Sequence, residues 1–172
     1  SKEINPDLII VHGDRVEALA SAIVGSFNNI FVSHIEGGEV SGTIDELIRH
    51  SVSKLSHFHL VANDKARSRL LQMGEREESV FVIGSPDVDI MFSDKLNSID
   101  FVKKHYEIPF KYFSILMFHS VTTELESIKE YAANLVDEVL NSNLNYIVIL
   151  PNNDLGSEDI VNELRRLENN EN

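Results

Sequence analysis

Short apolar runs alternate with segments of helical periodicity along the whole chain, and this alternation limits the folds open to it. Residues 16–27, 43–55 and 123–139 carry apolar side chains every three or four positions, which predicts helices that pack on a sheet. Strands alternating with helices form βαβ units, so we expect an α/β fold with parallel sheets buried on both faces. The runs that predict strands are residues 7–11, 30–35, 57–62, 79–83, 112–118 and 146–150.

The chain is expected to form two units. Residues 87–109 follow a less regular pattern, and we expect them to form the crossover between these units. Thr123 and Glu126 fit a capping box before the next helix, and Ser157 is expected to cap the last one. Because the chain opens almost directly on a predicted core strand, we also expect it to be a piece of a larger protein.

Composition narrows the classes of partner. The 172 residues carry 15 basic and 28 acidic side chains, a formal net charge of −13, which argues against binding nucleic acid. The absence of cysteine excludes disulfides, thiolate zinc sites and a cysteine nucleophile. No apolar run approaches about 18 residues, and no segment resembles a signal peptide. We therefore expect a cytoplasmic protein that binds neither nucleic acid nor membrane.

Polar and ionisable residues recur where the predicted strands end. Ligands of open α/β sheets bind at the carboxyl ends of the strands, so these residues are candidates for a catalytic cleft. Taken one by one, each is equally an ordinary loop residue or helix cap. The segments are residues 12–15, 34–39, 84–87, 119–120 and 151–154.

The turn from Glu36 to Glu39 and the helix after it admit two interpretations. Two glycines between carboxylates allow close approach of a ligand and an acid/base pair, or simply a tight connection with surface acids. Asp45 and Arg49 share one helix face, where Arg49 either orients Asp45 toward the strand ends or forms a surface salt bridge. HExxH, GxGxxG and GxxxxGK[ST] are absent, which removes the main signals for a zinc protease, a dinucleotide enzyme and a P-loop NTPase.

Five motifs carry a resemblance to a known family. They are residues 12–15 (HGDR), 34–50 (HIEGGEVSGTIDELIRH), 54–57 (KLSH), 84–86 (GSP) and 118–124 (FHSVTTE). Together they closely resemble the UDP-N-acetylglucosamine 2-epimerases, from about residue 6 to residue 157. The long second motif is similar to the hydrolysing branch, which feeds sialic acid and related nonulosonic acid synthesis. The non-hydrolysing branch typically has a Glu-Ala-Gly element instead.

The resemblance implies a fold and a reaction. The family fold is GT-B, two Rossmann-like domains that face each other across a cleft, in chains much longer than this one. Residues 1–100 would be the latter part of the N-terminal domain, and residues 101–172 the beginning of the C-terminal nucleotide-binding domain. The reaction eliminates UDP from a UDP-sugar substrate and hydrates a glycal-type intermediate, releasing N-acetylmannosamine, or a diacetylated relative, and UDP. The family needs no metal and no nicotinamide cofactor, and a homo-oligomer, dimer or tetramer, is expected.

The resemblance also implies site residues. Asp14, Glu36 and Asp45 match catalytic carboxylates, and we expect Glu36 and Asp45 to transfer protons while Asp14 supports them. Arg49 would position Asp45, and His119 would lie near the diphosphate, although Ser120 replaces the proline usual after it. The expected substrate-binding residues are Gly37, Gly38, Arg49, Ser85, His119 and Asn153.

Other functions remain open at this point. A non-hydrolysing epimerase would return the UDP-linked epimer, and a GT-B glycosyltransferase would need an acceptor. A catalytically incomplete fragment would bind a UDP-sugar without turnover. The sequence also leaves open which UDP-sugar is used and which carboxylate removes the proton from C2.

Overall fold

The computed structural model describes residues 4–121 and 123–168. The chain divides into two compact units, Ser1–Leu96 and Asn97–Asn172, and each is described by itself. The division falls within the segment expected to form a crossover. The assignment of residues 1–100 and 101–172 to parts of two larger domains stays a prediction.

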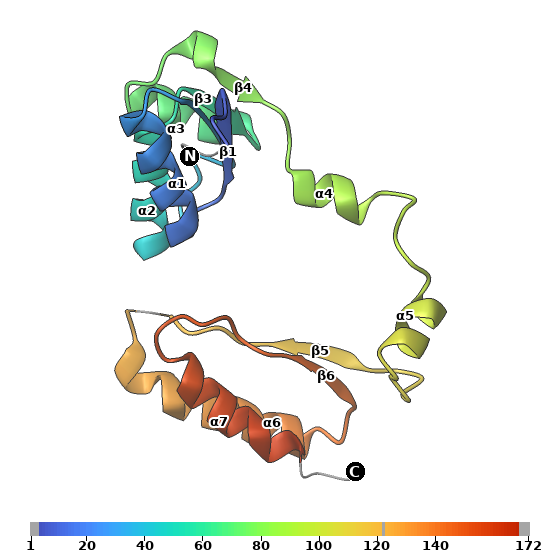
Figure 1. Ribbon diagram of the computed structural model, residues 1–172. Coiled ribbons are helices and arrows are strands. Elements are labelled where there is room, and N and C mark those ends of the chain that lie inside the picture. The colour runs from blue at the N-terminus through green and yellow to red at the C-terminus, as the bar shows by residue number, and fades with distance from the viewer. Residues whose placement is uncertain (1–3, 122, 169–172) are drawn as a thin grey trace. The chain divides into compact units, whose positions relative to one another are not determined.

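The first unit is a four-stranded parallel sheet with the strands in chain order, β1-β2-β3-β4 (Figure 1). Residue pairs across the sheet include Val11 with His34 and His34 with His59. The predicted alternation of parallel strands and helices is confirmed. The elements are β1 (Leu8–His12), α1 (Val16–Phe27), β2 (Phe31–Ile35), α2 (Ile44–Lys54), β3 (Phe58–Val61), α3 (Asp64–Gln72), a 3-10 turn (Glu77–Ser79), β4 (Val80–Val82) and α4 (Pro86–Met91).

Helices α1, α2 and α3 lie on one face of this sheet (Figure 1). Sequential parallel strands joined by right-handed crossovers place every connecting helix on the same side, which explains the arrangement. Val11 and Val32 pack against Ala18, Ala22 and Val52 there. A second cluster joins β3 and β4 to α3 through Val61, Val80, Ala66 and Leu70.

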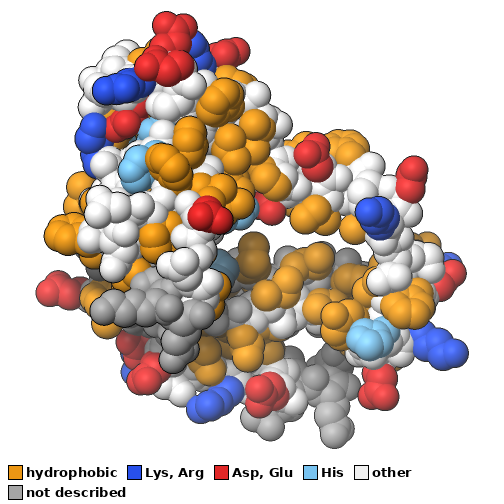
Figure 2. All heavy atoms as spheres, turned by 45° about the horizontal axis from the view of Figure 1, so that its top comes forward, with side chains coloured by type: hydrophobic (Ala, Val, Ile, Leu, Met, Phe, Trp, Pro, Cys, Tyr) orange, Lys and Arg blue, Asp and Glu red, His pale blue; other side chains and the backbone are white. Residues whose placement is uncertain are grey.

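The opposite face of the sheet is open in the part of the chain that the structure describes. Ile10 is 60% exposed and Phe31 is 55% exposed, and Phe58 and Phe81 lie on the same face by strand alternation. Figure 2 shows that hydrophobic side chains occupy part of the molecular surface. The expectation of a sheet buried on both faces is therefore wrong for these residues, because all three packed helices follow crossovers of one hand.

The second unit is smaller, with two parallel strands packed on two helices (Figure 1). Its core joins Leu116 to Ile128, Val136, Ile160 and Leu164. The elements are α5 (Ile99–His105), β5 (Ser114–Met117), a 3-10 turn (Leu125–Ser127), α6 (Ile128–Asn141), β6 (Tyr146–Ile149) and α7 (Ser157–Glu168).

Two predicted helix starts are wrong. A 3-10 turn precedes α6, so the helix begins at Ile128 and the capping box of Thr123 and Glu126 does not form its start. Ser157 is the first residue of α7, not its cap. Within residues 4–121 and 123–168, no helix combines the length and the apolar character needed to cross a bilayer.

Candidate active site

Three strand ends of the first unit meet at the carboxylate of Glu36. Nε2 of His12, the last residue of β1, lies 2.9 Å from Oε2 of Glu36. The hydroxyl of Ser85, which follows β4, donates to Oε1 at 2.9 Å. Glu36 itself follows β2 with φ at 65°, a left-handed conformation that is uncommon outside glycine. The fold therefore holds this carboxylate by both oxygens, at the edge where parallel α/β sheets bind ligands.

The surroundings of Glu36 favour its ionised form. Partial burial raises the pKa of the carboxyl, but hydrogen bonds from His12 and Ser85 together bring it below its ordinary value. The side chain stays 26% exposed. A carboxylate that is ionised, oriented and open to solvent is able to accept a proton from a bound molecule.

Arg49 binds Asp14 in this structure. Its guanidinium contacts Oδ2 of Asp14 and donates from Nη1 to the carbonyl of Glu39 at 3.1 Å. The hydroxyl of Thr43 donates to Oδ2 of Asp45 at 3.3 Å. The expectation that Arg49 positions Asp45 is therefore wrong, because the carboxylate after β1 reaches the guanidinium from a different segment.

The glycine turn after Glu36 packs tightly on the helices. A Cβ on Gly37 would lie 2.8 Å from Oγ of Ser53, and one on Gly38, where φ is 80°, would lie 2.5 Å from the carbonyl oxygen of Ala66. Glu39 turns to α3, where Asn63 donates to its Oε1 at 2.7 Å. The two carboxylates of the turn thus face different partners, which argues against an acid/base pair made of Glu36 and Glu39.

Gly38 offers a test of this packing. We expect Gly38→Ala to lower the free energy of unfolding by about 2 kcal/mol more than Gly42→Ala, because only the first Cβ meets backbone atoms. Gly42 is the matched control, since its φ is 71° and nothing lies within 4 Å of its added Cβ. Urea unfolding followed by circular dichroism measures both variants. Equal losses would show that the positive φ alone restricts these positions.

Two buried histidines were not among the candidate site residues. His34 contacts the carbonyl of Gly13 through Nε2 at 2.9 Å and Oγ of Ser53 through Nδ1 at 3.0 Å. His59 contacts Glu75 through Nε2 at 3.2 Å, and its Nδ1 has no hydrogen-bond partner among the described residues. The sequence does carry a signal for His34. It lies two residues before Glu36, and the alternation of side chains along β2 places it on the face of the sheet that packs against the helices.

The second unit carries the remaining predicted site residues. His119 follows β5, and the backbone N–H of Asn152, after β6, donates to its Nδ1 at 3.4 Å. Asn153 is the next residue in that loop. The two strand ends of this unit are thus linked at His119. Thr122, within the FHSVTTE motif, lies outside the described residues.

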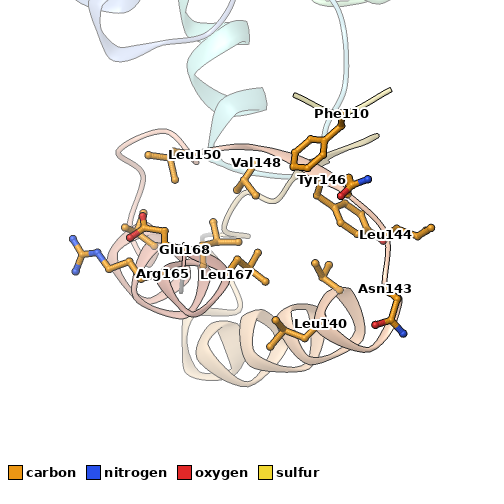
Figure 3. Close-up of a pocket in the computed structure, with 14 residues that line it drawn as sticks. Phe110, Leu140, Asn143, Leu144, Tyr146, Val148, Leu150, Arg165, Leu167 and Glu168 are labelled. Carbon is orange, nitrogen blue, oxygen red and sulfur yellow. The ribbon is translucent and has the colours of Figure 1, made fainter. Parts of the chain in front are cut away.

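Two cavities among the described residues lie apart from the predicted site residues. One of about 610 Å³ lies in the second unit, where Leu140, Val148 and Leu167 line it (Figure 3). None of the predicted site residues lines this cavity. A smaller one of about 450 Å³ lies beside Glu39 and Arg69 in the first unit. Within the described part of the chain, no group of three or more His, Cys, Asp or Glu residues is arranged to hold a metal ion.

Comparisons with known proteins identify relatives over nearly all of the chain. The family model described as UDP-N-acetylglucosamine 2-epimerase matches residues 1–171. A UDP-N-acetylglucosamine 2-epimerase of Neisseria meningitidis is 52% identical over 95% of this chain and 44% of its own length. A hydrolysing UDP-N,N'-diacetylbacillosamine 2-epimerase of Legionella pneumophila is 41% identical over 88% of this chain and 40% of its own length. The chain thus spans less than half the length of these relatives.

A solved structure shows the same fold. The UDP-GlcNAc 2-epimerase of Neisseria meningitidis, crystallised with UDP-GlcNAc, matches with a TM-score of 0.75 and 22% sequence identity. The match covers 95% of this chain and 48% of that one. At this identity the likeness concerns the fold alone, an α/β arrangement with parallel sheets.

Proposed function

The chain belongs to the UDP-N-acetylglucosamine 2-epimerase family, and we propose that the protein that carries it is a hydrolysing UDP-N-acetylglucosamine 2-epimerase. It would release UDP and free N-acetylmannosamine, or a diacetylated relative, for sialic acid or nonulosonic acid synthesis. The observation that carries the hydrolysing assignment is 41% identity, over 88% of this chain, to a relative named as hydrolysing. The 52% identity to the Neisseria meningitidis enzyme supports UDP-N-acetylglucosamine as the substrate.

The proposal includes a GT-B architecture. Residues 1–100 would form the latter part of the N-terminal Rossmann-like domain, and residues 101–172 the beginning of the C-terminal one. The division of the chain between Leu96 and Asn97 and the separate parallel sheet of each unit support this placement. The protein would act as a homo-oligomer, a dimer or tetramer.

The proposed reaction has two stages, an elimination and a hydration. In the first, a carboxylate takes the C2 proton, the electron pair forms a C1–C2 double bond, and the bond from C1 to the UDP oxygen breaks. In the second, water supplies a hydroxyl to C1, and a proton returns to the opposite face of C2. Neither stage has a net oxidation or reduction, so the chemistry calls for acids, bases and charge stabilisation.

Within this reaction, Glu36 and Asp45 would transfer the protons and Asp14 would support them. Hydrogen bonds from His12 and Ser85 orient both oxygens of Glu36 and, against the effect of burial, keep the pKa of its carboxyl below the ordinary value, so the side chain is in the ionised form that a base needs. The carboxylate of Asp14 is engaged in an ion pair with Arg49, which suits a supporting role.

The proposal also assigns roles to the substrate-binding residues within each unit. His119 and Asn153 would bind the UDP part, where an imidazolium offsets the charge that develops on the leaving diphosphate. Ser85 and Arg49 would act at the sugar end through Glu36 and Asp14, which they contact in this structure. Gly37 and Gly38 would let the turn that carries Glu36 lie close to the helices beneath it.

Incubation of the protein that carries this chain with UDP-N-acetylglucosamine in heavy water tests the proposed function. We expect UDP and free N-acetylmannosamine with one deuterium at C2, because the proton returned to C2 comes from solvent. Chromatography and mass spectrometry of the products measure both features, and UDP-N,N'-diacetylbacillosamine is the comparison substrate. A UDP-linked epimer would identify the non-hydrolysing reaction, and UDP binding without turnover would identify a binding fragment; either result would overturn the proposal.

A further inference from the structure

We propose that His34 is a positioning residue, whose buried imidazole fixes the loop that carries Asp14 to the helix that carries Asp45 and Arg49. The side chain of His34 is fully buried, and its hydrogen bonds go to Gly13 and Ser53, not to Asp14 or Asp45. The proposed role in turnover rests on the proposed function, whereas the arrangement of the imidazole does not.

Hydrogen bonding at both ring nitrogens determines one form of the imidazole. The carbonyl of Gly13 only accepts hydrogen bonds, so Nε2 of His34 must carry the proton that bridges the 2.9 Å between them. In the neutral ring Nδ1 is then an acceptor, and the hydroxyl of Ser53 donates to it over 3.0 Å. Burial lowers the pKa of His34 to about 4, although the hydrogen bond to Gly13 acts in the other direction. The ring is therefore neutral at physiological pH.

The two contacts connect separate segments of the predicted site. Gly13 lies between His12 and Asp14, just after β1, and Ser53 lies one turn beyond Arg49 on α2. The turn after Glu36 covers the pair, because a Cβ on Gly37 would lie 2.9 Å from Nδ1 of His34. One side chain thus joins the loop after β1, strand β2 and helix α2.

An apolar residue of similar size would fill the same space without these bonds. It would leave the partly buried carbonyl of Gly13 without its donor, so the loop would shift toward another partner or toward water. A shift of about 1 Å in a catalytic group is enough to cost about 100-fold in rate. The imidazole therefore contributes to the position of Asp14 and not only to packing.

Nitrogen NMR of the chain tests the arrangement without any assay of activity. We expect ¹⁵N shifts and couplings of His34 that show a neutral ring protonated at Nε2 between about pH 5 and pH 8. Exposed His105 in the second unit serves as the internal reference. A His34 ring protonated at Nδ1, or at both nitrogens near pH 7, would overturn the proposal.

Three variants test the positioning role in the protein that carries this chain. The amide of Gln reaches the place of Nε2, whereas that of Asn reaches the place of Nδ1. We expect His34→Asn to lower kcat about 100-fold with KM within about threefold of wild type. His34→Gln should recover to within about tenfold, and Ser53→Ala should lose less than His34→Asn, because Nε2 keeps its bond to Gly13.

Two further readouts separate positioning from folding. The carboxyl ¹³C signal of Asp14 should move in His34→Asn and return toward wild type in His34→Gln, whether or not the protein turns over. Equal kcat per folded molecule in wild type and His34→Asn, with only the melting temperature lowered, would assign His34 a structural role and overturn the proposal. A wild type without turnover would contradict the proposed function and leave the NMR measurements to decide the role of His34.

Discussion

Replacing Glu36 with Gln is expected to lower turnover about 1000-fold while UDP binding stays within a few-fold of wild type. The amide keeps the size of the side chain and an oxygen for the donors around it, but it cannot accept the C2 proton. The amide oxygen accepts from one of His12 and Ser85, and the amide NH2 donates to the other, since a neutral imidazole and a hydroxyl can both accept, so the fold around the strand ends should persist. Steady-state kinetics and calorimetric titration with UDP measure the two effects.

Glu39→Gln is the matched control, because it changes the other carboxylate of the same turn. Glu39 faces Asn63, the N-cap of α3, and Arg69 within that helix, so we expect a loss of less than about tenfold. Comparable losses in the two variants would contradict the assignment of Glu36 as the base. Loss of UDP binding in Glu36→Gln would indicate that this carboxylate holds the substrate and does not act on it.

We expect the free energy of unfolding to fall in acid because of His34. Burial lowers the pKa of His34 from 6.5 to about 4. Between these two pH values the imidazole is protonated in the unfolded chain and neutral in the folded chain. The contribution of His34 to stability is therefore complete above pH 6.5 and falls as the pH drops toward 4, by roughly 3 kcal/mol in all. The pKa of His59 is also lowered by burial, which adds a loss of the same sign.

Urea unfolding at several pH values between 4 and 7.5 measures this dependence. His34→Gln should start less stable but lose much less on acidification, because glutamine does not titrate. The groups with electrostatic effects on the ring are His59, Arg49 and Asp14, and all three remain in this variant. His105→Gln, which removes an exposed histidine from the second unit, is the matched control. A His34→Gln slope equal to that of wild type would contradict the prediction.

Much of the architecture follows from local patterns. Helix α1 occupies the predicted residues 16–27, and the six predicted strands are present with ends shifted by at most two residues. Such patterns work because helical and strand periodicity report which side of an element is apolar. They failed at the start of α6, where a 3-10 turn replaces the expected capping box.

The partners of charged side chains could not be predicted in the same way. Helical spacing places Asp45 and Arg49 on one face, but it does not show that Asp14, 35 residues earlier than Arg49, reaches the guanidinium. The open face of the first sheet was also missed. Alternating apolar residues look alike whether or not another layer covers them.

Local sequence is thus sufficient for the parallel α/β class, for the strand ends that carry Asp14, Glu36 and His119, and for the resemblance to the family. Tertiary structure alone decides that Arg49 binds Asp14, that Glu36 and Glu39 face different partners, and that Gly13 and Ser53 select one form of His34. Periodicity and motifs depend on neighbours along the chain. Ion pairs, tautomers and buried contacts depend on distances between segments that only folding brings together.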